Sequence, residues 1–188
     1  MDPFLALDAS AARVVALVEQ VDRSQWSQPT PCQDWNVRAL VGHLIATMHG
    51  HVALLHGSPA SVLSSLLEQQ ARAGGDDVVT ATADAATVVR AAFTEPGALE
   101  RTVHHLIGDV SGSRLLQMRI TENVVHGWDL ATALGLPATI EDALVEHVYD
   151  YLAPRAEALA VTGFYAPPKR TVGADASVQQ RLLSVVGR

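Results

Sequence analysis

The chain has 188 residues, carries a formal net charge of −7, and is 48% hydrophobic. This length and apolar content predict one domain, spanning residues 1–188, with a packed core rather than a disordered chain. The 13 basic residues are scattered and outnumbered by 20 acidic ones, which argues against nucleic acid or an anionic membrane surface as a partner.

Helical periodicity dominates the N-terminal half. Asp2 before Pro3 is typical of a helix start, and Asp34 or Asn36 can cap the next helix, which follows an ordered loop containing two prolines. In the helix that begins after Asp77, the side chains expected toward the core are Val88, Val89, Ala92 and Phe93. The predicted helices cover residues 3–22, 37–55, 60–71 and 78–93.

The C-terminal half begins with a short exception to this pattern. Residues 101–107 have β character and residues 108–112 resemble a turn, so a short extended excursion is expected near residues 100–110. The longest helix should run from about Ser113 to Leu134 and end at Gly135. Two capping-box patterns, at 139–142 and 177–180, predict helices to about Ala160 and over 178–186, with a loop over 162–174 between them. The predicted fold class is all-α.

One narrow stripe of the longest helix carries Arg119, Glu122, His126 and Asp129. Glu122 and His126 are four residues apart, so their side chains lie on one face, one turn apart, and form half of a metal site. The helix is apolar nearly all round, which predicts that the stripe is buried and needs partners. His43, at the edge of the apolar stripe of helix 37–55, is the best candidate for a further ligand.

Plainer interpretations of the same residues stay open at this point. The stripe is also compatible with a solvent-facing ion pair between Arg119 and Glu122, and His43 with a hydrogen-bonded packing residue. Asp129 is interpreted either as a group that orients a ligand imidazole, or as a surface charge or partner of an arginine. Arg119 is a candidate for contacting an anionic substrate group.

The other reactive side chains are given structural interpretations. Cys32 has no adjacent base in its loop, so packing is favoured over a nucleophilic role. As the single cysteine of the chain it forms no internal disulfide, which fits a reducing compartment. The remaining histidines are interpreted as surface or pocket-rim residues: His49, His51, His56, His104, His105 and His147.

The chain is expected to be cytoplasmic. Its N-terminal segment lacks the basic region and long apolar core of a signal peptide. No apolar run approaches the about 18 residues that suggest a membrane span. A membrane is therefore not expected as a partner.

Several segments together resemble the DinB-like superfamily. They are Trp26-x-x-Pro29-Thr-Pro-Cys-x-x-Trp35-x-Val37, Leu40-Val-Gly-His43-Leu and Val125-His126-Gly-Trp128-Asp129-Leu. Within it, the chain is most similar to the N-terminal domain of mycothiol-dependent maleylpyruvate isomerase and to a group of stand-alone, uncharacterised metal-binding proteins. The tail fits the latter group through Gly163-Phe164, Pro167-Pro168, Ala174-Asp175-Ala176 and Arg181-Leu-Leu.

The resemblance implies a four-helix bundle with a divalent ion in its interior. In the isomerase branch the ligands are a histidine on the second helix and a Glu-x-x-x-His pair on a later one, which match His43, Glu122 and His126. The isomerase has a further C-terminal domain, which this chain is expected to be too short to contain. Members of the superfamily often pair, so a homodimer is also expected.

These observations support two main hypotheses. In the first, the protein is a metal-dependent thiol S-transferase or isomerase that uses mycothiol or a similar thiol and a small electrophile; zinc is the default metal, and nickel, cobalt or iron also fit. In the second, it is a non-catalytic metal-binding or ligand-sensing bundle. A weaker, third alternative is a structural dimerisation module in which His43 and Glu122 are hydrogen-bonded.

Overall fold

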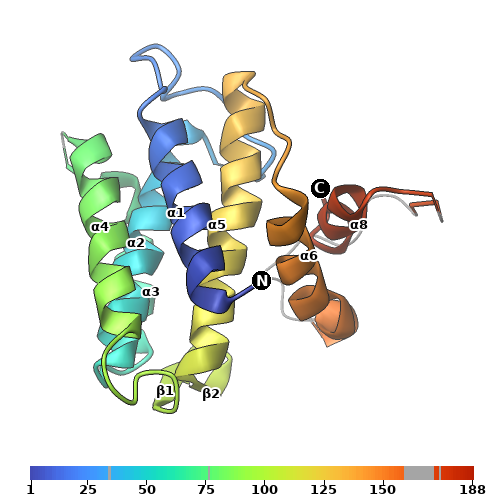
Figure 1. Cartoon of the computed structure of the whole chain (residues 1–188). Helices are drawn as coiled ribbons and strands as arrows, with labels where there is room; N and C mark the ends of the chain where they lie inside the picture. The colour runs from blue at the N-terminus through green and yellow to red at the C-terminus, as the bar shows by residue number, and fades with distance from the viewer. Residues whose placement is uncertain (34, 76, 159–171, 174) are drawn as a thin grey trace.

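Four long helices form the body of the computed structural model, which describes residues 1–33, 35–75, 77–158, 172–173 and 175–188 (Figure 1). Helices α1 and α5 run in one direction, and α2 and α4 run in the other. Both α1 and α2 contact α4 and α5, so the four helices enclose a common core. The predicted all-α four-helix bundle is confirmed. The bounds are α1 Pro3–Val18, α2 Val37–Leu55, α4 Val78–Phe93 and α5 Gly112–Leu134.

Short polar side chains start these helices, as the sequence predicts. The carboxylate of Asp2 accepts from the backbone N–H of Phe4 at 2.9 Å, and the Asn36 side chain accepts from that of Ala39 at 2.9 Å. At the other end of α5, Gly135 adopts a left-handed conformation with φ of 69°. Helix α1 is one turn shorter than expected. The backbone N–H groups of Gln20 and Val21 bond to carbonyl oxygens three residues back, and this tighter turn ends the helix.

The predicted helix over 60–71 is divided in two, α3 (Ser61–Glu68) and the 3₁₀ turn η1 (Gln70–Arg72). Both pieces pack along α2. A side chain at Gly50 of α2 would overlap Leu63 of α3, so the glycine permits this close approach. Because α3 and η1 run along α2, Gln70 lies beside the middle of the bundle.

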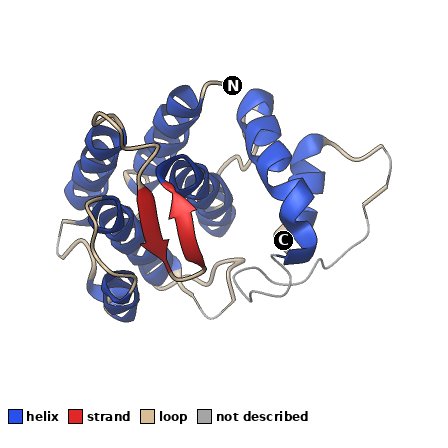
Figure 2. Cartoon of the chain, turned by 90° about the horizontal axis from the view of Figure 1, so that it is seen from below, coloured by secondary structure: helices blue, strands red, loops and turns tan. Residues whose placement is uncertain are grey.

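A β-hairpin closes one end of the bundle. Strand β1 (Thr102–His105) pairs antiparallel with β2 (Gly108–Ser111), and Figure 2 shows the pair lying across the helix ends. The prediction of a turn over 108–112 is therefore wrong: those residues form β2 and the first residue of α5. The register places Val103 opposite Val110, and both are buried, so their burial favours a paired strand.

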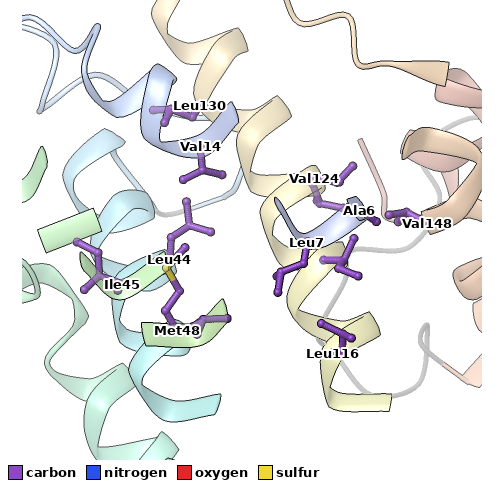
Figure 3. Packing of buried hydrophobic residues seen from close by; sticks show 14 of the residues in the cluster. Ala6, Leu7, Val14, Leu44, Ile45, Met48, Leu116, Val124, Leu130 and Val148 are labelled. Atoms are coloured by element: carbon purple, nitrogen blue, oxygen red, sulfur yellow. The ribbon is translucent and has the colours of Figure 1, made fainter. Parts of the chain in front are cut away.

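The core is aliphatic and continuous. Figure 3 shows Leu44 and Met48 of α2, with Leu7 and Val14 of α1 and Leu116 and Leu130 of α5. On α4, Val89, Ala92 and Phe93 are buried as expected, whereas Val88 is 45% exposed. The prediction for Val88 is wrong because the inward stripe of α4 follows the helical spacing of 85, 89 and 92.

A second layer, formed by α6 (Asp142–Leu152) and α8 (Val178–Val185), packs beside α1 and α5 (Figure 1). Val148 of α6 lies near Ala6 and Val124 in Figure 3. The capping box predicted at 139–142 is wrong, because Glu141 precedes α6 without a side-chain cap, whereas the box of Ser177 and Gln180 is confirmed.

Helix α6 ends before the predicted Ala160. It passes at Leu152 into the 3₁₀ turn η2 (Ala153–Arg155), where Pro154 has no N–H to continue the helix. Residues 159–171 and 174 lie outside the described residues, and with them almost all of the loop predicted over 162–174. None of the described helices is both long enough and apolar enough to cross a membrane.

Candidate metal centre

The structure brings together the three predicted ligands where α2 faces α5. The Nε2 atom of His43 lies 2.8 Å from Oε2 of Glu122, and Nε2 of His126 lies 3.5 Å from the same oxygen. One ligand atom from each residue lies within 4.8 Å of the other two, a grouping that could hold a metal ion. The side chains of His43 and His126 are 12% and 8% exposed, whereas that of Glu122 is 23% exposed. Glu122 therefore lies at the more open side of the group.

Each imidazole is oriented through its other nitrogen. Nδ1 of His43 lies 3.2 Å from the side-chain oxygen of Gln70, and Nδ1 of His126 lies 3.0 Å from Oδ2 of Asp129. Both partners offer an acceptor oxygen, so each Nδ1 is placed to donate a hydrogen bond. In the tautomer protonated at Nδ1, the Nε2 atom of each ring has a lone pair that a metal ion can accept. Without a metal, the 2.8 Å contact between Nε2 of His43 and Glu122 is a hydrogen bond, which requires a proton on Nε2. Sequence analysis missed Gln70, which lies 27 residues along the chain from His43.

The electrostatics of the group favour a negative Glu122. Burial alone would raise the pKa of Glu122, but the hydrogen bond with His43 and the charges of the two histidines and Arg119 hold it far below its usual range. Burial lowers the pKa of His43, although Glu122 opposes the shift. The carboxylate thus stays ionised while desolvation disfavours a second proton on the His43 ring.

Trp35 packs against both histidines. Its ring centroid lies 4.5 Å from that of His43 and 5.7 Å from that of His126. The two imidazoles approach edge to face at 5.0 Å. Trp35 lies in the segment between α1 and α2, so this connection covers part of the group. The signal in the sequence was the position of Trp35 in the Pro-Cys-x-x-Trp pattern.

Asp129 connects His126 to the C-terminal residue Arg188. It is fully buried, so its interpretation as a surface charge is wrong. Nε of Arg188 donates to Oδ1 of Asp129 at 2.6 Å, and one terminal nitrogen donates to Oδ2 at 2.8 Å. Burial would raise the pKa of Asp129, but the hydrogen bonds from His126 and Arg188 lower it. The structure therefore combines parts of both interpretations of Asp129. The carboxylate bonds to the His126 imidazole, and it also has an arginine partner.

Cys32 lies beside this pair. Cys32, His126 and Asp129 make up a second group of described residues whose ligand atoms lie within 4.8 Å of one another. Burial raises the pKa of the Cys32 thiol to about 11, with the charges of Asp129 and Glu122 adding to the shift and Arg188 opposing it. At neutral pH the thiol is therefore protonated, which fits the expectation that Cys32 is not a nucleophile.

Arg119 ties the two helices together one turn from Glu122. It is fully buried and donates from Nη1 to Oγ1 of Thr47 at 2.7 Å, while Thr47 donates to the carbonyl oxygen of His43 at 2.9 Å. The alternative of a solvent-facing stripe is therefore wrong, because Arg119 and Asp129 are both 0% exposed. The Arg119 side chain therefore links α5 to α2.

Five of the six remaining histidines divide into two sets, and the sixth, His147, is half-buried on α6. His49, His56 and His104 are exposed, as expected, and His56 and His104 pair with Glu95 and Asp109. His51 and His105 are instead buried, at 3% and 7% exposure, with ring centroids 6.1 Å apart, so their interpretation as surface residues is wrong. His51 follows His43 by two helical turns and therefore shares its inward face.

Comparisons with known proteins identify the family of the chain. A family model described as the mycothiol maleylpyruvate isomerase N-terminal domain matches residues 7–131. Uncharacterized proteins from two strains of Mycobacterium tuberculosis, CDC 1551 / Oshkosh and ATCC 25618 / H37Rv, are each 31% identical to this chain over 144 residues, which is 77% of this chain and 74% of each relative.

The fold is also that of a solved enzyme. The crystal structure of a mycothiol-dependent maleylpyruvate isomerase matches with a TM-score of 0.67 and 16% identity, covering 82% of this chain and 68% of the enzyme, and a mutant of that enzyme matches equally well. At this identity the likeness shows that the two proteins share a fold. The family match covers well over half of the chain, and the chain therefore belongs to the family of the mycothiol maleylpyruvate isomerase N-terminal domain.

Proposed function

We propose that this protein binds a divalent metal ion through Nε2 of His43, the carboxylate of Glu122 and Nε2 of His126. One observation carries the proposal: both imidazoles direct Nε2 toward the same carboxylate oxygen while Nδ1 is engaged by an acceptor. When both rings carry their proton on Nδ1, two nitrogen lone pairs and a carboxylate oxygen converge at short range and repel one another. A cation among them removes this repulsion and satisfies all three groups.

The donor set fits a particular range of metals. Two imidazoles and one carboxylate are the protein ligands of many catalytic zinc sites, which leave a further position for water or substrate. Nickel, cobalt and iron accept the same donors. The partly exposed Glu122 side chain gives the open position a route to solvent, whereas the Trp35 ring covers the two histidines.

We further propose that the protein acts on a small thiol, mycothiol or a relative, together with a small electrophile. Membership of a family named after a mycothiol-dependent isomerase supports this class of substrate. When bound, a divalent ion supplies the positive charge that favours the thiolate form of a thiol near neutral pH. The chain's own contribution is to hold the ligands rigid through Gln70 and Asp129 and to exclude water from the histidines.

A non-catalytic metal-binding or ligand-sensing bundle is the second candidate. It is favoured because the matched family model describes an N-terminal domain rather than a whole isomerase. It shares the metal site and differs only in chemistry. Assays of conjugation between the thiol and a panel of electrophiles, with and without metal, separate the two candidates: turnover that depends on metal supports the enzyme, and tight thiol binding without turnover supports the sensor.

The metal assignment is tested by elemental analysis of protein purified without a histidine tag. We expect close to one metal ion per chain. His43→Ala and His126→Ala should lose it, and Glu122→Gln, which keeps the shape and removes the charge, should weaken binding by more than the about 10–100-fold typical of losing a partner outside the metal's own ligands. His49→Ala is the control, because His49 lies on α2 but is exposed. Retention of metal by both histidine variants would contradict the assignment.

A further inference from the structure

Arg188 places a buried positive charge beside Asp129, which accepts a hydrogen bond from the candidate ligand His126. Arg188 follows α8, and its side chain is only 7% exposed. Two of its nitrogens each donate to a different oxygen of Asp129, a two-point contact that fixes the plane of the carboxylate as well as its position. Oδ2 of Asp129, which accepts from one of these nitrogens, also accepts from the His126 ring. The guanidinium, the carboxylate and the imidazole thus form one buried chain of hydrogen bonds.

The same contact explains the second metal-like group. Cys32, His126 and Asp129 are spaced as metal ligands, but both oxygens of Asp129 are already bonded to Arg188. A buried carboxylate with 0% exposure requires a cation nearby, and here a guanidinium provides it. The Cys32 thiol lies close enough to Arg188 for the guanidinium to lower its pKa. This group is therefore better described as an arginine site than as a second metal site.

We infer that Arg188 is a positioning residue of the metal centre, acting on His126 through Asp129. The inference rests on the proposed function, because it concerns the ion held by His43, Glu122 and His126. Without Arg188, Asp129 would keep the His126 ring as its hydrogen-bond partner among these residues, and its carboxylate would be free to rotate. The direction of Nε2 of His126 would then be less well defined. Arg188 lies outside the matched residues 7–131, so the coupling joins the family domain to α8.

Cobalt(II) is the probe, because its visible spectrum reports the geometry and the number of its ligands. The full chain, stripped of metal, is titrated with Co²⁺ as wild type and as Arg188→Met, which keeps length and removes the charge. We expect Arg188→Met to weaken Co²⁺ binding by about 10–100-fold and to alter the spectrum of the saturated site. Arg188→Lys retains the charge without the two-point contact and should lie between them.

Two further variants separate positioning from the docking of α8. Arg181→Met is the matched control: Arg181 is also on α8, donates to the backbone oxygen of Ala176 and packs on Tyr149. It should leave both affinity and spectrum unchanged. Asp129→Asn should resemble Arg188→Met, and the double variant should be no worse than the more affected single one, because both changes break the same connection.

The outcomes distinguish the inference from the function on which it rests. Wild-type protein that binds no Co²⁺ overturns the proposed metal site and the inference together. Wild-type binding with an unchanged affinity and spectrum in Arg188→Met overturns the inference alone. Equal losses in Arg188→Met and Arg181→Met also overturn it, since they would reflect loss of α8. If Arg188→Met does not fold, the spectrum of Arg188→Lys, which keeps the buried charge, decides in its place.

Discussion

At the scale of single residues, the candidate centre depends on how two imidazole rings are held. His43 and His126 come from different helices, yet each has an acceptor on Nδ1 and the Glu122 carboxylate near Nε2. The acceptors differ in charge. Gln70 is neutral and lies in a 3₁₀ turn, whereas Asp129 is an ionised residue of the same helix as its histidine. The two rings should therefore respond differently when these acceptors are removed.

Replacing Gln70 tests the neutral acceptor. Gln70→Leu keeps the bulk of the side chain but removes the oxygen that accepts from Nδ1 of His43. We expect the affinity for the divalent ion to fall by about tenfold, at the low end of the range for such partners, because no charge is lost. Isothermal titration of the metal-free protein measures the change.

The neighbouring Gln69→Leu is the control for this substitution. The Gln69 side chain donates to a backbone carbonyl of α3 and is exposed, so the variant should bind metal as wild type does. Equal affinity in the wild type and Gln70→Leu would show that His43 is oriented without Gln70.

The residues recognised from the sequence are those linked by local spacing. Glu122, His126 and Asp129 lie within two turns of one helix, and their common face follows from 3.6 residues per turn. His43 was recognised by its position on a helical face and by the family pattern. Gln70 and Arg188 were missed because no local pattern relates Gln70 to His43, or Arg188 to Asp129, from which it is separated by 59 residues.

At the scale of elements, α5 must start at one place for its polar stripe to face α2. Ser111 caps the helix by accepting from the N–H of Arg114, and Gly112 is its first residue. The N–H of Gly112 also donates to the carbonyl oxygen of Arg101, just before β1. A Cβ at Gly112 would collide with the backbone carbonyl of Ala98, so the turn before β1 and the start of α5 are packed backbone against backbone.

Gly112→Ala should therefore destabilise the protein. The Ala98 backbone cannot move aside as a flexible side chain would, and we expect a loss of about 1–3 kcal/mol in the free energy of unfolding. Gly127→Ala, in the same helix, is the matched control: its Cβ would lie 3.6 Å from Val14, an ordinary contact, and gains up to about 1 kcal/mol of helix propensity.

Urea unfolding of both glycine variants, monitored by circular dichroism, measures the difference. A Gly112→Ala variant as stable as the wild type would mean that the hairpin connection adjusts easily. In that case the connection would not fix the start of α5.

Element boundaries show which predictions local chemistry supports. Helices α4 and α5 were predicted to within a residue at both ends, with Asp77 marking the start of α4 and Gly135 the end of α5. Strand β2 was taken for a turn because its four residues include only one apolar side chain, Val110. Its partner Val103 lies on the opposite strand, so the pairing depends on the packing of the hairpin against the bundle.

At the scale of the whole molecule, a second pair of histidines is buried in the core. His51 and His105 come from α2 and β1, and the buried Nδ1 of His51 has no hydrogen-bond partner among the described residues. Burial lowers the pKa of both rings, and for His51 the charge of Arg119 adds to the shift while that of Glu122 opposes it. The folded protein thus holds these rings neutral at pH values where the unfolded chain protonates them.

This difference predicts the direction of the pH dependence of stability. Because both pKa values lie below the ordinary 6.5 in the folded state, the unfolded chain binds more protons as the pH falls below 6.5. The metal-free protein should therefore lose stability with acidification, by up to about 1.4 kcal/mol per pH unit for each ring. His51→Gln should reduce this slope, and the exposed His49→Gln should preserve it.

Unfolding by urea in the presence of a chelator, at pH values from about 7.5 to about 5, measures the slope. Asp129 affects stability at lower pH than the two histidines do. Its pKa in the folded protein lies below the ordinary 3.8, so its contribution to stability is lost only as the pH falls toward that folded pKa. A slope unchanged by His51→Gln would mean that the His51 ring accepts a proton inside the folded protein.

The sequence by itself determined the helices, most of their caps, and the three candidate ligands with Asp129. These follow from the periodicity of apolar residues and from short spacings within one helix, which act over a few residues. Only the tertiary structure decided that Gln70, Trp35 and Arg188 reach the same centre, that His51 and His105 are buried, and that Asp129 shares a buried arginine. Those outcomes depend on which faces of distant elements are packed together, and no local spacing encodes that choice.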